Sequence, residues 1–418
     1  MQREALLIIG NGMAATRLCA ELSTLAPGRF DITIVGAEPH PAYNRVLLSS
    51  LLAGEIGAAD IELHPAEWWQ ARGVSVRTGC AVDAIDTATR RVRLADGAVL
   101  PYTSLVLATG SQAIRLPVPG MELDGVTTFR DRADVDSLLA AARPGRRAVV
   151  IGGGLLGLEA ATGLAAAGVE TAVVHLADRL MERQLDAPAA SLLRRAVEAR
   201  GIAVHLGAST ARIEGTTRAE ALHLADGRCL PADLVVVACG VRPQAELARA
   251  AGIACGRGVL VDDGLATDAP GIYAIGECAE HRGEVYGLVE PAYEQARVLA
   301  ARLAGGAESA ATYAGSVIAT NLKVSGVRVF SAGDFTGDAA TQDIVLADSG
   351  AAHYRRLVLR EDAHATRLVG AVLFGDTADG PYYLELIRSG RDIGGERADI
   401  AFGPPGAFPT PILDREAA

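Results

Sequence analysis

The residues Ala5–Ala15 read A-L-L-I-I-G-N-G-M-A-A, and this stretch decides the fold. Five aliphatic residues in succession predict a buried strand, and Gly10–Gly12 ends it in a tight turn. The pattern then becomes typical of a helix, which we expect to continue to about Leu25. A second aliphatic strand follows at residues 32–35, and Glu38 comes shortly after it. Strand, turn, helix and strand in this order form the βαβ unit of a parallel sheet.

The turn has the composition of a dinucleotide-binding motif. Gly10 allows the tight turn, Gly12 lets backbone N–H groups approach a pyrophosphate, and Ala15 permits the helix to pack closely on the strand. Glu38 is then expected to bind ribose hydroxyls. An ordinary α/β protein can carry a glycine turn that binds nothing, but here the strand, the spacing, the helix and the acid coincide. The dinucleotide interpretation is therefore favoured.

The same arrangement recurs near the middle of the chain. A strand at residues 148–151 enters G-G-G-L-L-G at Gly152–Gly157, a helix is expected to about Ala167, and another strand follows at residues 170–176. Each unit is matched further on by an aliphatic strand that ends in small residues and is preceded by a predicted β-hairpin. The repeat predicts two related domains that hold two dinucleotides.

The second motif differs from the first at the end of its second strand. Gly152, Gly154 and Gly157 supply the turn, the pyrophosphate contact and the packing position. Glu159 is expected on the first helical turn, close to where a nicotinamide would approach. The strand ends in V-V-H, so His175 stands where a ribose-binding acid is expected. A neutral histidine can bond ribose hydroxyls, and a surface histidine without a role fits equally well.

The rest of the sequence completes the first domain and adds a third. Strands predicted at residues 259–261 and 272–275 and a helix at residues 290–303 return the chain to the first domain, and alternating apolar residues after Tyr313 indicate an antiparallel sheet with helices. We expect an α/β fold with two Rossmann-like domains, each of three ββα layers, and a C-terminal α+β domain. The expected limits are 1–113 with 245–312 for the first domain, 114–244 for the second and 313–418 for the third.

Composition and charge exclude several classes of protein. The chain of 418 residues has a net charge of −11 at pH 7, which opposes binding to nucleic acid or anionic membranes. Its six cysteines form no C-x-x-C or C-x-x-x-x-C pair and no Cys/His cluster, so we expect small buried thiols rather than a thiol relay or a metal site. The first apolar run is too short for a signal peptide, and the longest, residues 148–158, is too short for a membrane helix. A cytoplasmic protein is therefore expected.

Together these features resemble the flavoproteins with two dinucleotide-binding domains and a glutathione-reductase-like fold. The resemblance covers nearly the whole chain, and it is closest to the N-terminal FAD and NAD(P)H part of the assimilatory nitrite reductase large subunit and to rubredoxin and ferredoxin reductases. It rests on Y-N-R-V-L-L-S at Tyr43–Ser49, V-V-H-L-A-D-R-L-M-E-R-Q-L-D at Val173–Asp186, Y-A-I-G-E-C-A at Tyr273–Ala279 and G-L-V-E-P at Gly287–Pro291. The resemblance implies FAD in the first domain and NAD(P)H in the second.

The resemblance also gives further residues a role. Arg45 would neutralise the FAD pyrophosphate, although a solvated arginine is the alternative, and Glu277 takes the place of a shorter Asp that contacts the ribityl chain in the wider family. NADH is favoured as the coenzyme, while Arg179 and Arg183 keep NADPH open. The residues expected at FAD are Gly10, Gly12, Met13, Ala14, Ala15, Glu38, Arg45, Val82, Ala108, Thr109, Gly110, Gly276 and Glu277. Those expected at the nicotinamide coenzyme are Gly152, Gly154, Leu155, Leu156, Gly157, His175 and Gly240, with Glu159 as the catalytic residue.

Two departures from the family pattern bear on mechanism. Rubredoxin and ferredoxin reductases carry a Lys near the flavin, and Ser50 occupies that position here. Glu159 therefore has no Lys partner, and we expect it either to hold the nicotinamide amide or to cap its helix. The nitrite reductase subunit continues into Cys-rich iron–sulfur and sirohaem domains, whereas no cysteine follows Cys278 in this sequence. We do not expect the chain to reduce nitrite by itself.

The expected activity is an FAD-dependent NAD(P)H oxidoreductase that passes electrons from NADH through the flavin to a separate redox protein. The acceptor could be ferredoxin-like, rubredoxin-like, a globin, or the nitrate or nitrite reductase of an assimilation pathway. An NAD(P)H oxidase that uses O₂ is the alternative, and a flavin-bound sensor or interaction protein is a third. Arg355, Arg356 and Arg360 are candidates for a basic docking face, which a solvated strand edge explains equally well. The chain could be a monomer or a homodimer.

Overall fold

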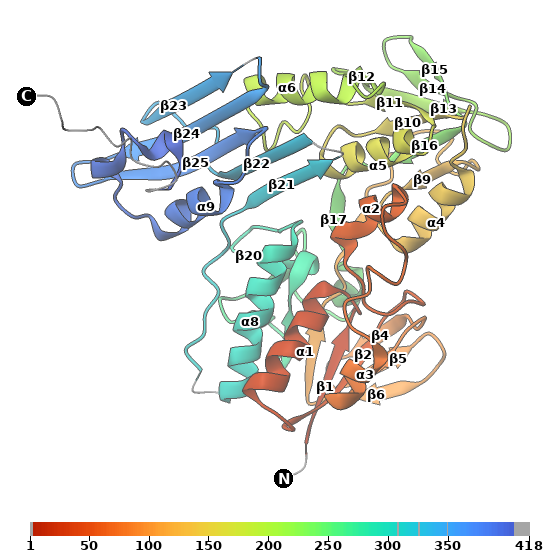
Figure 1. The fold of residues 1–418 in the computed structure, drawn as a ribbon. Helices are drawn as coiled ribbons and strands as arrows, with labels where there is room; N and C mark the ends of the chain where they lie inside the picture. Colours follow the sequence, from red (N-terminus) through yellow and green to blue (C-terminus); the bar gives the residue numbers. More distant parts are fainter. Residues whose placement is uncertain (1–2, 307–308, 325–326, 349, 405–418) are drawn as a thin grey trace, which may run out of the picture.

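The computed structural model describes residues 3–306, 309–324, 327–348 and 350–404. The chain folds into three units (Figure 1). The first unit is built from the two ends of the first 306 residues, the second from the middle of that stretch, and the third from the C-terminal part. The expected fold class is confirmed, because the five-stranded sheets of these units are two parallel ones and one antiparallel one.

The first sheet has the strand order β19-β7-β1-β2-β3, and all of its pairs are parallel. On β1, Leu6 and Ile8 point into one core while Leu7 and Ile9 point into another, as a period of two requires. Two long helices, α1 and α8, cover the first of these faces, and the small sheet β4-β5-β6 covers the second. The strands are β1 Glu4–Ile9, β2 Phe30–Val35, β3 Val74–Arg77, β4 Val82–Asp86, β5 Arg91–Leu94, β6 Val99–Pro101, β7 Ser104–Leu107 and β19 Ile272–Ala274. The helices are α1 Met13–Leu25 and α8 Val289–Gly305.

The second unit repeats this plan, with the parallel order β12-β11-β10-β16-β9. Helix α5 follows β10 as α1 follows β1, and a three-stranded sheet, β13-β14-β15, again lies on the opposite face. The predicted strand 170–176 ends early, at Val174. The strands are β9 Val126–Thr128, β10 Arg147–Ile151, β11 Glu170–Val174, β12 Ala203–His205, β13 Thr210–Glu214, β14 Ala221–Leu224, β15 Cys229–Pro231 and β16 Leu234–Val237. The helices are α4 Arg132–Ala141, α5 Leu155–Ala166 and α6 Ala187–Glu198.

Short elements connect the first two units. Strands β8 and β17 pair where the chain enters and leaves the second unit, and α2 of the first unit packs on α5 of the second. The other short elements complete the first unit. The connecting elements are β8 Ser111–Ala113, β17 Val241–Pro243 and α2 Leu48–Leu52. The others are β18 Val259–Val261, β20 Ala279–His281, η1 Arg45–Leu47, α3 Ala66–Ala71, α7 Glu246–Ala250 and η2 Gly276–Cys278.

The third unit is an antiparallel sheet with the order β21-β22-β25-β24-β23. Helix α9 packs on β22 and β25 on one face, and α6 of the second unit lies against the other face (Figure 1). The elements are β21 Ala319–Val324, β22 Val327–Gly333, β23 Thr341–Asp348, β24 His353–Glu361, β25 Thr366–Phe374, α9 Gly380–Ser389, η4 Gly394–Glu396 and η5 Ile400–Phe402.

One hydrophobic cluster runs through all three units. It joins Leu52 of α2, Leu164 of α5 and Phe374 of β25, all of which are buried. At the crossing of α2 and α5, a Cβ on Gly163 would lie 2.9 Å from Leu52 Cγ, so the two helices approach as closely as a glycine permits. Units that share a core of this kind do not rotate freely against one another.

Candidate functional site

The two glycine turns have the same backbone geometry. Gly10 has φ +112° and Gly152 has φ +124°, a region that other residues rarely adopt. A Cβ on Gly10 would lie 2.0 Å from the carbonyl oxygen of Ala108, and a Cβ on Gly152 would lie 2.2 Å from that of Ala238. Each turn is therefore pressed against the end of the neighbouring strand, β7 or β16, and only glycine fits.

Beside each tight turn the space is open. Gly12 and Gly154 are the N-cap residues of α1 and α5, and a Cβ on either would meet no heavy atom within 4 Å. Neither helix has a side-chain cap, so its first N–H groups are available to an anion in that space. Helix α1 begins with Met13 and Ala14, and α5 with Leu155 and Leu156, the residues predicted to line it. The donors and the space fit a dinucleotide pyrophosphate at both positions.

The third motif position controls how closely each helix packs on its strand. A Cβ on Gly157 would lie 1.9 Å from the carbonyl oxygen of Gly152, so that position excludes any side chain. In the first unit Ala15 takes the position and is fully buried. The second helix therefore lies closer to its turn than an alanine would allow.

The middle residue of each turn is matched to the residue that follows the second strand. In the first unit Asn11 lies in the turn, and a Cβ on Gly36 would be 2.6 Å from the Asn11 Cβ. In the second unit the bulk is reversed, because a Cβ on Gly153 would be 2.8 Å from Cγ of His175. The same Cβ would lie 2.7 Å from Leu180 Cδ2. In each unit one of the two segments therefore carries a glycine at this crossing, and the two units place that glycine on opposite segments.

The backbone register shows which residues of the two units correspond after the second strand. The N–H groups of Gly10 and Gly152 donate to the carbonyls of Val35 and Val174, so His175 corresponds to Gly36. The residue that corresponds to Glu38 is Ala177, which has no carboxylate. Both ring nitrogens of His175 are engaged: the Gly153 N–H donates to Nδ1 at 3.0 Å, and Nε2 lies 2.9 Å from Glu182 Oε2.

Glu38 and Arg45 form an ion pair at the end of β2. The Tyr43 hydroxyl donates to the second oxygen of Glu38 at 2.6 Å, and Arg45 also donates to the Arg130 carbonyl at 3.1 Å. Burial raises the pKa of the Tyr43 hydroxyl, which keeps it a donor. Glu38, the predicted ribose contact, and Arg45, the predicted pyrophosphate contact, therefore lie against each other.

Glu277 has partners from two other segments. The Ser111 hydroxyl donates to its Oε2 at 2.8 Å, and Arg130 forms an ion pair with the same oxygen. Arg130 and Glu277 are largely buried, with 14% and 18% of their side chains exposed. Nothing in the sequence pointed to Arg130, which lies 147 positions before Glu277 and follows β9 of the second unit. It joins the second unit to the predicted FAD site.

The remaining predicted residues lie around the same turns. Gly276 has φ +79°, and a Cβ on it would be 3.1 Å from the Ala14 Cβ, so η2 meets the start of α1. Thr109, directly after Ala108, donates from its hydroxyl to the Gln244 carbonyl at 2.7 Å. Val82 packs on the cluster that contains the ends of β1 and β2. Positive φ values of +69° at Gly110 and +101° at Gly240 let the chain leave β7 and β16.

Glu159 lies at the start of the second turn of α5, one residue beyond the turn predicted for it. It is four residues before Gly163 and so lies on the face of α5 that meets α2 of the first unit. Gly154, not Glu159, is the N-cap residue, so the helix-capping alternative is wrong. Burial raises the pKa of Glu159 to about 7, and the described residues give its carboxylate no hydrogen bond or ion pair.

A prediction for Glu159→Gln follows from this burial. The wild-type pKa rises from 4.5 in the unfolded chain to about 7 in the folded one, so stability is full below pH 4.5 and is lost as the pH rises to about 7. The neutral amide avoids that loss. In urea unfolding we expect the variant to match the wild type at pH 4 and to be about 3 kcal/mol more stable at pH 8. Glu170→Gln, an exposed carboxylate on β11, is expected to change neither value, and equal stabilities of Glu159→Gln and wild type at pH 8 would contradict the burial.

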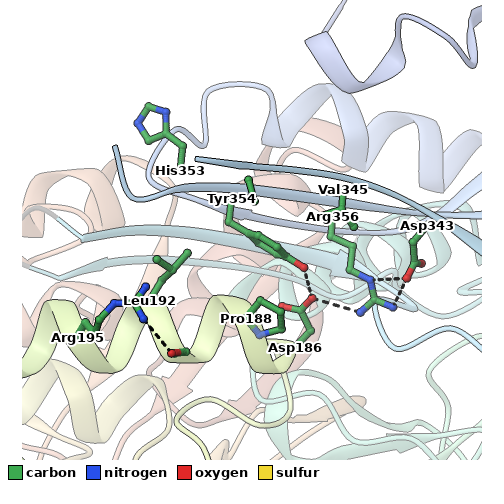
Figure 2. A pocket seen from close by; sticks show the side chains of 11 residues that line it. Asp186, Pro188, Leu192, Arg195, Asp343, Val345, His353, Tyr354 and Arg356 are labelled. Carbon is green, nitrogen blue, oxygen red and sulfur yellow. Dashed lines mark hydrogen bonds and ion pairs between the residues drawn. The ribbon is translucent and has the colours of Figure 1, made fainter. Parts of the chain in front are cut away.

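Each of the three arginines expected to form a basic docking face has a carboxylate partner within the molecule. Arg355 pairs with Asp379 at 2.7 Å and Arg360 with Asp338 at 2.9 Å. Figure 2 shows Arg356 between Asp186 and Asp343, at 3.4 and 2.9 Å, beside a groove of about 660 Å³ between α6 and the strands β23 and β24. These arginines join elements within the molecule, and the Tyr354 hydroxyl adds a donor to Asp186 at 2.5 Å.

The six cysteines are free thiols that differ in burial. Cys19 and Cys278 are buried as expected, whereas Cys229 is exposed, contrary to expectation. The described residues contain no group of three or more His, Cys, Asp or Glu side chains placed to hold a metal ion. In the same part of the chain, no helix combines the length and the apolar character that crossing a bilayer requires.

Comparison with protein families identifies two segments. Residues 4–296 match the pyridine nucleotide-disulphide oxidoreductase family. Residues 319–391 match the C-terminal domain of rubredoxin NAD⁺ reductase. The first match covers both glycine turns, and the second covers all five strands of the antiparallel sheet.

Among individual proteins, two similar relatives come from Bacillus subtilis. The chain is 46% identical to a nitrite reductase [NAD(P)H] over 94% of its own length and 48% of the relative, and 42% identical to an assimilatory nitrate reductase electron transfer subunit over 94% and 50%. It thus spans about half the length of these relatives. A ferredoxin reductase from Rhodopseudomonas palustris has the same fold, with a TM-score of 0.86, 28% identity, and coverage of 96% of this chain and 98% of that one.

Proposed function

Since this chain belongs to the pyridine nucleotide-disulphide oxidoreductase family, we propose that it carries electrons from NADH through FAD to a separate redox protein. It is an FAD-dependent NAD(P)H oxidoreductase. Bound FAD would supply the chemistry of accepting a hydride from the coenzyme and releasing the electrons to the acceptor. The observation that carries the proposal is the pair of open helix N-termini at Gly12 and Gly154. Each lies beside a glycine, Gly10 or Gly152, whose positive φ and close approach to the neighbouring strand form a tight turn.

We assign FAD to residues 1–113 with 245–312, and NADH to residues 114–244. At the first site Gly10, Gly12 and the start of α1 would hold the pyrophosphate, Glu38 the ribose, and Glu277 with Arg130 the ribityl side. At the second site Gly152, Gly154 and the start of α5 would hold the coenzyme pyrophosphate. Glu159, on the face of α5 that meets α2, would contact the nicotinamide end, because that face is directed at the first unit.

For the acceptor we propose a protein of nitrate or nitrite assimilation. Two relatives that match 94% of this chain are a nitrite reductase and an electron transfer subunit of nitrate reductase. The likeness to a ferredoxin reductase and to the rubredoxin NAD⁺ reductase C-terminal domain supports small iron–sulfur or iron proteins as further candidates. Residues 313–418 would form part of the docking face.

Anaerobic reduction followed by reoxidation tests this function. The purified protein is expected to contain one FAD per chain, and an equivalent of NADH should bleach its flavin absorption without oxygen. Addition of a rubredoxin, a ferredoxin or the assimilatory nitrite reductase should then restore the colour much faster than air does. Fast reoxidation by air with no effect of any protein acceptor would instead indicate an oxidase, and a protein that takes up no FAD would contradict the whole assignment.

A further inference from the structure

The carboxylate placed at the second glycine turn belongs to Glu182, which the sequence analysis did not single out. Glu182 lies in the segment between β11 and α6, and this segment folds back onto the turn: the Met181 N–H donates to the Gly153 carbonyl at 3.0 Å. Leu180, Met181 and Leu185 are fully buried, so the segment is fixed on both sides of Glu182. The Glu182 side chain itself remains 33% exposed.

His175 fixes the direction of that carboxylate. Because the Gly153 N–H donates to Nδ1 of His175, Nδ1 carries no proton, and the proton of the neutral ring is on Nε2. Nε2 therefore donates to Glu182 Oε2, at 2.9 Å. The described residues give Oε1 of Glu182 no partner, so this oxygen can accept a hydrogen bond from a ligand beside the turn.

The other charged side chains close to Glu182 in the sequence have no bond to His175 or to the second glycine turn in the described part of the chain. Asp178 and Arg179 pair with each other at 3.2 Å. Arg183 is exposed and has no side-chain partner in the described part of the chain. Ala177, which corresponds to Glu38 of the first unit, supplies no charge at all.

We propose that Glu182 is the residue that selects NADH over NADPH, with His175 as its positioning residue. One oxygen of Glu182 would accept from the adenosine ribose hydroxyls, and its charge would repel the 2′-phosphate of NADPH. In this unit the selecting acid comes from the segment after the strand rather than from the strand end, because His175 occupies that end. The inference rests on the proposed NADH site.

Binding of coenzyme fragments tests this without flavin chemistry. Titration calorimetry of the FAD-loaded protein would compare ADP-ribose with its 2′-phosphate in the wild type, Glu182→Gln and the control Glu170→Gln. A charge-assisted hydrogen bond corresponds to about a tenfold to a hundredfold change in Kd, so the wild type should prefer ADP-ribose by at least about tenfold. Glu182→Gln should lose that preference, and Glu170→Gln should keep it.

Flavin reduction by NADH separates a positioning role from a structural one. In His175→Ala we expect Kd for NADH to rise while the rate at saturating NADH stays near that of the wild type. The double variant with Glu182→Gln should be no worse than Glu182→Gln alone, because both changes remove the same contact. Additive effects would show that His175 acts apart from Glu182 and would overturn its role.

The failures of the two proposals are distinguishable. If NADH reduces the wild-type flavin but the ratio of the two fragment affinities is the same in Glu182→Gln as in the wild type, the selector is misassigned and the function stands. If the wild type binds neither fragment and neither coenzyme reduces the flavin, the NADH site itself is wrong and the inference falls with it.

Discussion

Replacing Gly154 by glutamate is expected to abolish flavin reduction by NADH while leaving FAD in place. Gly154 has φ −83°, and a Cβ there meets no heavy atom within 4 Å, so the folded backbone accepts a side chain. A carboxylate at a helix N-terminus also does not destabilise the free protein. It would, however, occupy the space in front of α5 and repel a pyrophosphate. Loss of two or three charge-assisted hydrogen bonds corresponds to about a thousandfold weaker binding.

Stopped-flow measurement of the loss of flavin absorption quantifies this effect, and dithionite serves as a reductant that needs no second site. Gly154→Ala is the matched control for the backbone and should retain most of the activity. Gly12→Glu, the equivalent change at the first turn, should instead release FAD. Normal reduction of Gly154→Glu by NADH would mean that the coenzyme binds elsewhere.

Arg130→Ala is expected to cost both stability and FAD affinity. The change leaves the Glu277 carboxylate, 18% exposed, without its cation, and removing one partner of a buried pair costs about 3 kcal/mol. FAD should bind about tenfold to a hundredfold more weakly if the arginine also supports the ribityl side of the site. Urea unfolding of the apoprotein and fluorescence titration with FAD measure the two effects separately.

A double variant distinguishes these two roles of Arg130. In Arg130→Ala/Glu277→Gln no charge is left unpaired, so the stability should recover most of its loss, whereas the affinity for FAD should not recover. Arg218→Ala removes an exposed arginine of the second unit and should change neither. Full recovery of FAD affinity in the double variant would show that Arg130 acts only by neutralising Glu277.

Features that depend on neighbouring residues were predictable from the sequence. The turn at Gly10 and its repeat at Gly152 require a positive φ, which glycine supplies, and both occur where the aliphatic strands stop. The predicted helix at residues 290–303 is α8, Val289–Gly305. The strand predicted over 170–176 ends at Val174 because the backbone of the next residues bonds to the loop after β12, through Gly207 and Ala208.

Contacts between distant segments were not predictable. Arg130 reads as one more charge after β9, and only the packing of the second unit on the first brings it to Glu277. The same limit applies to the ion pairs of the arginines of β24. The sequence shows a run of positive charge, but not the acids that pair with it. These acids, among them Asp186 and Asp379, lie in other segments of the chain.

The matched pairs Asn11–Gly36 and Gly153–His175 also restrict how such a repeat can diverge. In the first unit, side chains on both segments would place two Cβ atoms 2.6 Å apart, and in the second unit a Cβ on Gly153 would lie within 3 Å of side-chain atoms of both His175 and Leu180. In the first unit, any route to the arrangement of the second by single substitutions must therefore pass through glycine at both positions. That intermediate has an unfilled crossing and a looser turn. The first half is consequently held in its own arrangement, because the residue after β2 can gain a side chain only in a chain whose turn has already lost that of Asn11.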